Sequence, residues 1–104
     1  MDDVRIDVGL YTHFVIDCSQ VDFTGIEKLI FTVKNSTGLK DPPVIRREFT
    51  AGGLQDVYIT PEESIQVKNN AFWDVDKVLT NGQQYKMTDN GRVVLRFGVG
   101  ECID

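Results

Sequence analysis

Apolar and polar residues alternate with a period of two along most of the chain, and this pattern predicts β-strands. In residues 29–34 every second residue is large and apolar, and residues 92–99 repeat the alternation more clearly. No window offers three turns of helical periodicity between capping residues. The inward-facing positions of these strands predict a core that contains Leu29, Phe31, Val33, Trp73, Val75, Val93, Leu95 and Phe97.

Turn signals separate the shorter β-rich runs. Residues 44–49 and 56–59 flank Ala51-Gly52-Gly53, whose glycines permit a tight reversal, so we expect a hairpin there. Asn81-Gly82 is the strongest short hairpin signal, since both residues accept positive φ. Asp89-Asn90-Gly91 repeats that turn chemistry before the final strand.

Three positions predict departures from simple alternation. Residues 5–8 and 11–16 lie on either side of Gly9, where we expect a bulge or a change of sheet. Residues 60–64, Thr-Pro-Glu-Glu-Ser, combine a capping box with a proline at the first helical position, which predicts a single helical turn. At Lys77 the alternation breaks, so either a bulge intervenes or the strand leaves the core.

These elements predict an all-β fold: an antiparallel two-sheet sandwich of immunoglobulin-like type, with about seven strands and one short helical turn near residues 60–64. A chain of 104 residues has room for one hydrophobic core, so we expect a single domain over residues 1–104. The apolar and charged fractions, 41% and 26%, are ordinary for folded proteins and argue against disorder.

The net charge and the absence of targeting signals limit the classes of partner that we expect. The net charge of −5 repels nucleic acid, and Arg46 and Arg47, as neighbours on a strand, point to opposite faces and form no basic patch. The acidic start lacks the features of a secretory signal, and no apolar run is long enough to span a membrane. We expect a cytoplasmic protein with no nucleic-acid or membrane partner.

The two cysteines predict packing residues. Cys18 and Cys102 lie near opposite ends of the chain, and in the cytoplasm such cysteines are more often reduced than bridged. They form no Cys-x-x-Cys motif and have no histidine at metal-ligand spacing.

Candidate catalytic groups are few. His13 is the only histidine, and its strand-like context favours a surface or hydrogen-bonded role. Cys18 lies five residues away and could in principle pair with it, but no motif supplies an oxyanion hole or a third orienting group. We therefore expect no enzyme, no catalytic residue and no cofactor-binding residue.

Metal, phosphate and carbohydrate sites are disfavoured as well. Asp74 and Asp76, two apart on one strand face, could meet a cation or share a proton, but solvated acids are the favoured interpretation, and no Asp-x-Asp-x-Asp-Gly loop is present. Gly52-Gly53 lacks the spacing of a phosphate loop. Five aromatic residues raise the alternative of a carbohydrate platform: Tyr58, Phe72, Trp73, Tyr85 and Phe97. Core or cross-strand packing is favoured, because only Tyr58 and Phe72 alternate onto outward positions.

The order of motifs over residues 26–99 resembles the small immunoglobulin-like domains of phage and prophage tail or baseplate proteins, such as the N-terminal domain of baseplate upper proteins. The motifs are the strand at 26–34, Val-Tyr-Ile-Thr-Pro-Glu-Glu-Ser at 57–64, Ala-Phe-Trp-Asp-Val at 71–75, the turn at 81–82 and the final strand at 91–99. The segment through Asp22 does not match.

The resemblance implies a non-catalytic structural or adaptor protein of the tail, baseplate or neck, without a cofactor. Its partners would be other virion proteins and copies of itself, and it would reside in the host cytoplasm during assembly and then in the virion. The alternative is a glycan-binding or adhesive module of a bacterial surface protein. That function ordinarily requires export, and the missing signal sequence counts against it.

Overall fold

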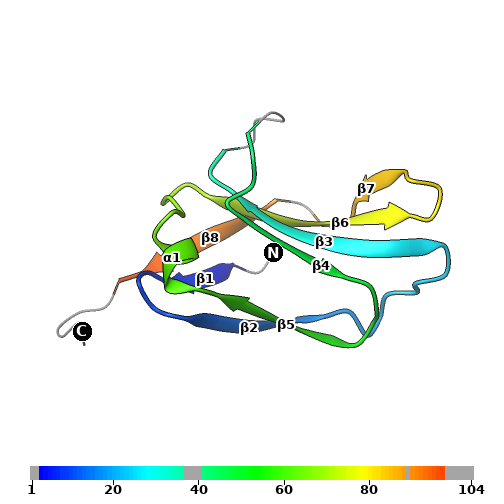
Figure 1. Cartoon of the computed structure of the whole chain (residues 1–104), viewed down its shortest axis with the longest axis horizontal. Helices are drawn as coiled ribbons and strands as arrows, with labels where there is room; N and C mark the ends of the chain where they lie inside the picture. The colour runs from blue at the N-terminus through cyan, green and yellow to red at the C-terminus, as the bar shows by residue number, and fades with distance from the viewer. Residues whose placement is uncertain (1–2, 37–40, 89, 98–104) are drawn as a thin grey trace.

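The computed structural model describes residues 3–36, 41–88 and 90–97 and is mostly β (Figure 1). One sheet has the order β1-β8-β6-β3-β4, with the short β7 paired to β6, and a second sheet consists of β2 and β5. The strands are β1 (Val4–Asp7), β2 (Thr12–Asp17), β3 (Ile26–Lys34), β4 (Ile45–Phe49), β5 (Leu54–Ile59), β6 (Phe72–Leu79), β7 (Gln84–Lys86) and β8 (Gly91–Arg96). A single helical turn, α1 (Pro61–Ser64), follows β5.

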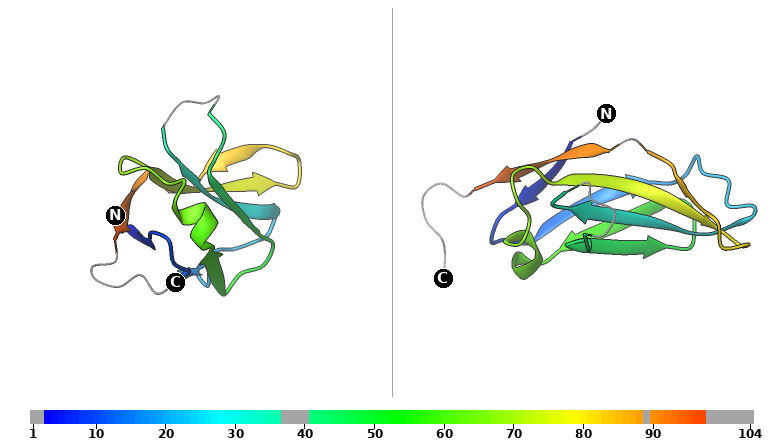
Figure 2. Two further views of the ribbon diagram at one scale, coloured as in Figure 1. Left: turned by 60° about the vertical axis from the view of Figure 1, so that its left-hand side comes forward. Right: turned by 90° about the horizontal axis from the view of Figure 1, so that it is seen from above.

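The two sheets pack face to face, and the core lies between them (Figure 2). Five residues of the predicted core are buried: Leu29, Phe31, Val33, Val75 and Val93. The small sheet contributes Val57 and Ile59, which are completely buried. The ring of Phe14 on β2 meets that of Phe31 on β3 edge to face, with centroids 5.6 Å apart, so aromatic packing joins the layers.

The predicted core was wrong at Phe97, which is 63% exposed. Trp73 and Leu95 are partly buried and pack against the core. β8 ends at Arg96, so Phe97 follows the last paired residue of the strand. Alternation placed it on the inward side, but the inward direction leads to a core only where an opposing sheet is present.

The sheets are not purely antiparallel, which corrects the sequence prediction. β1 pairs with β8 in parallel, whereas its chain neighbour β2 pairs with β5 in the other sheet. The chain changes sheet at Gly9, which has φ +79°. Of the two expectations for Gly9, the change of sheet is therefore the one observed. Positive φ there suits glycine because a Cβ would strain this conformation.

The predicted hairpin between residues 44–49 and 56–59 was also wrong. β4 pairs with β3 and β5 pairs with β2, so residues 50–53 carry the chain from one sheet to the other (Figure 1). The glycines permit a reversal, but they do not determine whether the flanking strands hydrogen-bond to each other. By contrast, the Asn81-Gly82 turn does join a paired hairpin, β6 with β7.

The predicted helical turn is confirmed, with a complete capping box. The backbone N–H of Glu63 donates to Oγ1 of Thr60, and the backbone N–H of Thr60 donates to Oε1 of Glu63, at 3.2 and 3.0 Å. Arg47 of β4 adds a tertiary contact, because its Nη2 reaches both Glu63 carboxylate oxygens and the carbonyl oxygen of Tyr58. One arginine therefore joins β4, β5 and α1.

β6 continues without interruption through Lys77, where the alternation breaks. Its register with β3 shifts between Ile26 and Lys28, so the irregularity lies opposite the end of β6 and not at Lys77 itself. Lys77 pairs with Leu29, and its ammonium lies over the ring of Tyr85 on β7, 5.9 Å from the centroid. The lysine is therefore accommodated by a cation–π contact at the rim of the sheet.

Candidate functional site

The residues that could have supported catalysis lie apart. His13 is half exposed on the outer face of the small sheet, where Nε2 is 2.8 Å from Oδ1 of Asp56 and the imidazole stacks on the ring of Tyr58. This confirms a surface, hydrogen-bonded histidine.

Cys18 is buried. Its burial and, to a lesser extent, the nearby Asp17 carboxylate raise the pKa of its thiol. A buried, protonated thiol is a poor nucleophile. Cys102 lies outside the described residues.

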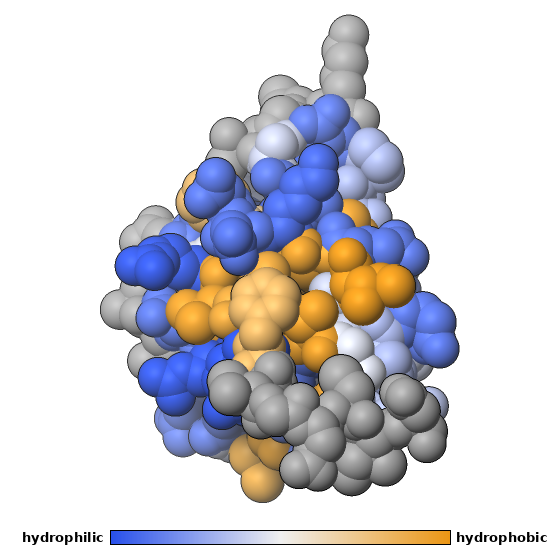
Figure 3. Space-filling model, turned by 90° about the vertical axis from the view of Figure 1, so that its left-hand side faces the viewer, coloured by the Kyte–Doolittle hydropathy of each residue, from blue (hydrophilic) through white to orange (hydrophobic). Residues whose placement is uncertain are grey.

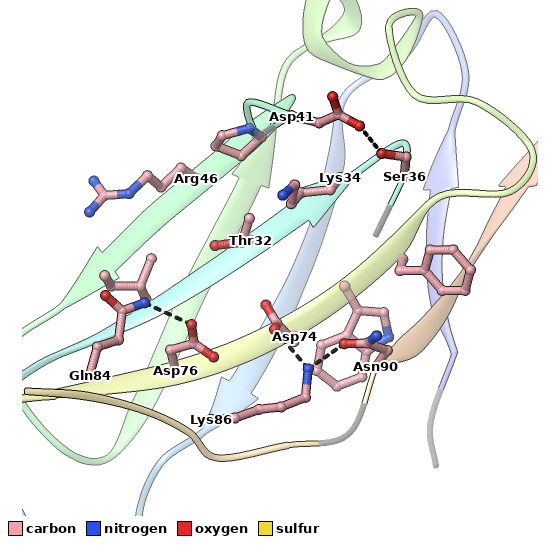
Figure 4. A pocket seen from close by; sticks show the side chains of 14 residues that line it. Thr32, Lys34, Ser36, Asp41, Arg46, Asp74, Asp76, Gln84, Lys86 and Asn90 are labelled. Atoms are coloured by element: carbon pink, nitrogen blue, oxygen red, sulfur yellow. Dashed lines mark hydrogen bonds and ion pairs between the residues drawn. The ribbon is translucent and has the colours of Figure 1, made fainter. Parts of the chain in front are cut away.

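Asp74 and Asp76 share the outer face of β6 and meet side chains of β7 (Figure 4). Lys86 Nζ lies 3.2 Å from Asp74 Oδ2 and also donates to Asn90 Oδ1, while Gln84 Nε2 donates to Asp76 Oδ2 at 2.8 Å. Each acid thus has a partner on the hairpin. Within the described part of the chain, no three His, Cys, Asp or Glu residues gather closely enough to hold a metal ion.

A groove of about 420 Å³ runs over this outer face, between β4 on one side and β6–β7 on the other (Figure 4). Ile30 and Thr32 of β3 line it, and Arg46 stands across Thr32 from Asp74. Arg46 is paired with Glu48 along β4. Ion pairs within the molecule therefore occupy much of the charge here. The expectation of solvated acids is wrong for Asp76, because its Oδ1 is buried and has no hydrogen-bond partner in the described part of the chain.

The prediction that Arg46 and Arg47 diverge is confirmed. The Arg46 side chain lines the groove on the outer face, whereas Arg47 reaches over the edge of the sandwich to Glu63. No concentrated basic patch arises from the pair.

An apolar patch occupies one end of the molecule, and sequence patterning did not identify it. Leu10, Ile65 and Phe97 are 59%, 65% and 63% exposed. They come from three separate segments: the β1–β2 turn, the C-cap of α1 and the residue after β8. Two hydrogen bonds hold these segments together: Gly9 N–H to Ser64 Oγ at 2.8 Å and Val8 N–H to the Arg96 carbonyl at 2.9 Å.

We call Leu10, Ile65 and Phe97 the end patch. Figure 3 looks onto this end and shows hydrophobic side chains gathered at its centre, with hydrophilic ones around them. Contiguous apolar surface that is rimmed by polar residues is typical of interaction sites. A signal was present in the sequence, since each of the three is a large apolar residue at the edge of an element, but only the fold brings them to one place.

Comparison with protein-family models, with curated proteins and with solved structures finds no match to this chain. A bilayer-spanning helix, which would need to be long and apolar throughout, does not occur in the described residues.

Proposed function

We propose that this chain is a non-catalytic structural or adaptor module that acts through protein–protein contacts, and that it belongs to the tail, baseplate or neck of a phage or prophage virion. The observation that carries the contact function is the end patch: Leu10, Ile65 and Phe97 are more than half exposed at one end of the sandwich. Burying such side chains against a partner removes apolar surface from water, which favours association.

The proposed fold type is immunoglobulin-like, and the strand order supports it. Immunoglobulin sandwiches place strands G, F, C and C′ side by side in one sheet and strands B and E in the other. Here β8, β6, β3 and β4 follow the first order, and β2 and β5 occupy the second pair of positions. The chain order B, C, C′, E, F, G is also reproduced, with the short β7 inserted between the F and G positions.

The placement in a virion depends on the order of motifs over residues 26–99 and is tested separately from the contact function. Purified particles induced from the host should contain this chain at a fixed stoichiometry, as measured by mass spectrometry. Its absence from particles would reject the virion role.

The end patch is tested in the same particles with substitutions that leave the core intact. Leu10→Ser combined with Phe97→Ser should reduce incorporation, because the two substitutions remove apolar contact surface from the end patch. The variant should still fold, since both side chains are exposed and contribute little to folding. Leu54→Ser is the matched control, since Leu54 is 70% exposed on β5 of the small sheet. Equal incorporation of the double variant and the control would contradict a role for the end patch.

A further inference from the structure

A second groove, of about 680 Å³, lies along the seam between the edge strands β1 and β2. Six consecutive residues of β2, Thr12–Asp17, line it. Because successive side chains of a strand point to opposite faces, a lining made of consecutive residues places the groove along the edge of the strand. Figures 1 and 2 show β1 and β2 diverging from their shared turn.

The hydrogen-bond register shows which backbone groups of β2 face this groove. The N–H of Cys18 donates to the carbonyl of Gly53 on the β5 side. Hydrogen-bonded pairs alternate with non-bonded pairs in an antiparallel ladder, so Ile16, Phe14 and Thr12 also bond toward β5. The N–H and C=O groups of His13, Val15 and Asp17 therefore point away from β5, and no backbone group of the described residues pairs with them.

The edge of β1 faces the same groove. The N–H of Val8 bonds to β8, so the alternate residues Asp7 and Arg5 direct their backbone groups away from β8. The N–H of Asp7 donates to Oγ1 of Thr12 at 2.8 Å, which closes the groove at the end near the turn. Toward Asp3 and Asp17 no such bond joins the two strands in the described residues.

The interior wall of the groove is the rim of the hydrophobic core. Phe31, Trp73 and Val75 of the large sheet line it, together with Phe14 and Ile16 of β2. Phe14, Ile16 and Trp73 are only partly buried. Apolar side chains that entered from the seam would complete the burial of these residues.

The opposite edge of the small sheet is protected. The carbonyl of Tyr58 on β5 faces outward in the same way, and Arg47 covers it with a hydrogen bond of 3.0 Å. Proteins commonly guard sheet edges with such charged side chains. Arg5 and Arg96 line the groove beside β2, but among the described residues no side chain hydrogen-bonds to the backbone groups of His13, Val15 or Asp17. The outward backbone groups of the two edges of the small sheet therefore differ in whether a side chain covers them.

We propose that the groove between β1 and β2 binds an extended segment of another polypeptide, which pairs with the free edge of β2 and adds a strand to the small sheet. Main-chain hydrogen bonds at His13, Val15 and Asp17 would provide affinity, as in other strand-addition complexes. The inference goes beyond the end patch and does not depend on membership of a virion.

The surroundings define the chemistry of the segment. Its inward side chains, at every second position, are apolar, because they meet Phe14, Ile16 and Trp73. Its outward side chains are polar, with a basic residue next to Asp17, since Asp17 is exposed on the outer face of β2, whereas Arg5 and Arg96 line the groove on the side of β1 and β8.

The test begins with a displayed library of random peptides of about ten residues, enough to span β2, selected against the full chain. Enriched peptides should alternate apolar residues with polar ones and favour Lys or Arg at the polar position that lies next to Asp17. On binding, the amide hydrogens of Val15 and Asp17 should exchange more slowly, as measured by NMR.

Val15→Pro separates edge pairing from other contacts. The Val15 N–H faces the groove, so proline removes a donor that the β2–β5 ladder does not use, and edge positions tolerate proline. Peptide binding should weaken about tenfold or more, whereas Val15→Thr, which keeps the N–H, should bind as the wild type does. Circular dichroism checks that both variants fold.

N-methylated peptides keep the test decisive if Val15→Pro does not fold. Two peptide series are made, one methylated at the odd-numbered amides and one at the even-numbered amides. One series should lose binding and the other should keep it, because only one set of amides faces β2. Three outcomes would overturn the proposal: no enriched peptide, binding unaffected by Val15→Pro in a folded variant, or equal effects of the two methylated series. None of these outcomes depends on the content of a virion or on the end patch.

Discussion

The indole of Trp73 on β6 packs directly against the backbone of Gly91, the first residue of β8. The two are cross-strand partners, and an ideal Cβ on Gly91 would lie 2.1 Å from Nε1 of Trp73. Gly91 is buried, and its φ is not among the positive values. The glycine is therefore required by the close approach of an aromatic ring, whereas the sequence pattern assigned it to turn chemistry.

Gly91→Ala should destabilise the fold by about 1–3 kcal/mol, the usual cost of overpacking. The free energy of unfolding in urea measures it. Gly52→Ala is the control, since a Cβ there would meet its nearest atom, the Cys18 carbonyl oxygen, at 3.4 Å. In a Trp73→Phe background the cost of Gly91→Ala should fall, because the smaller ring leaves space. An unchanged cost would show that the indole is not what excludes the side chain.

Phe97→Ala should change the free energy of unfolding by less than about 0.5 kcal/mol, because Phe97 is mostly exposed. Phe31→Ala should cost about 3–5 kcal/mol, since Phe31 is completely buried between the sheets. Thermal or chemical unfolding of the two variants side by side distinguishes a surface aromatic from a core one. A large loss at Phe97 would mean that its ring packs on the domain in solution.

The Arg47–Glu63 pair should make stability depend on pH in the acidic range. Burial is the largest influence on Glu63 and raises its pKa, but the hydrogen bonds and charge of Arg47 and the hydrogen bonds of Thr60 together lower the pKa below its ordinary 4.5. A lowered pKa in the folded state stabilises the fold above the unfolded pKa, and this stabilisation is lost as the pH falls through the folded value.

Glu63→Gln tests this linkage. The difference in unfolding free energy between wild type and Glu63→Gln should be full near neutral pH and should shrink below about pH 4.5. Glu62→Gln, at an exposed position of the same helical turn, is the control. A difference that stays constant down to the acid limit would contradict the role of the Glu63 charge.

Cys18 should react slowly with thiol reagents in the folded protein at neutral pH. Its side chain is buried, and burial together with Asp17 raises the pKa of the thiol above 9.0, so little reactive thiolate is present. Alkylation with iodoacetamide followed by peptide mass spectrometry reports Cys18 separately from Cys102. Denaturant should bring its rate to that of a free cysteine, whereas fast labelling of the native protein would show that the site opens.

The sequence determined the local structure because local rules depend on neighbouring residues. Alternation identified the strands and five buried core residues, the capping box predicted the turn at 60–64, and Asn81-Gly82 predicted the β6–β7 hairpin. Side-chain direction on a strand also placed Arg46 and Arg47 on different sides. Each of these follows from φ, ψ and hydrogen bonds within a few residues.

Only the tertiary structure decided which strands pair and what lies opposite each face. The parallel contact of β1 with β8, the passage of residues 50–53 between sheets and the exposure of Phe97 depend on segments far apart in the chain. The same is true of the end patch and of the groove between β1 and β2. Periodicity specifies the two faces of a strand, but burial and edge pairing depend on whether another layer or strand occupies the adjacent space, which is set by the packing of the whole fold.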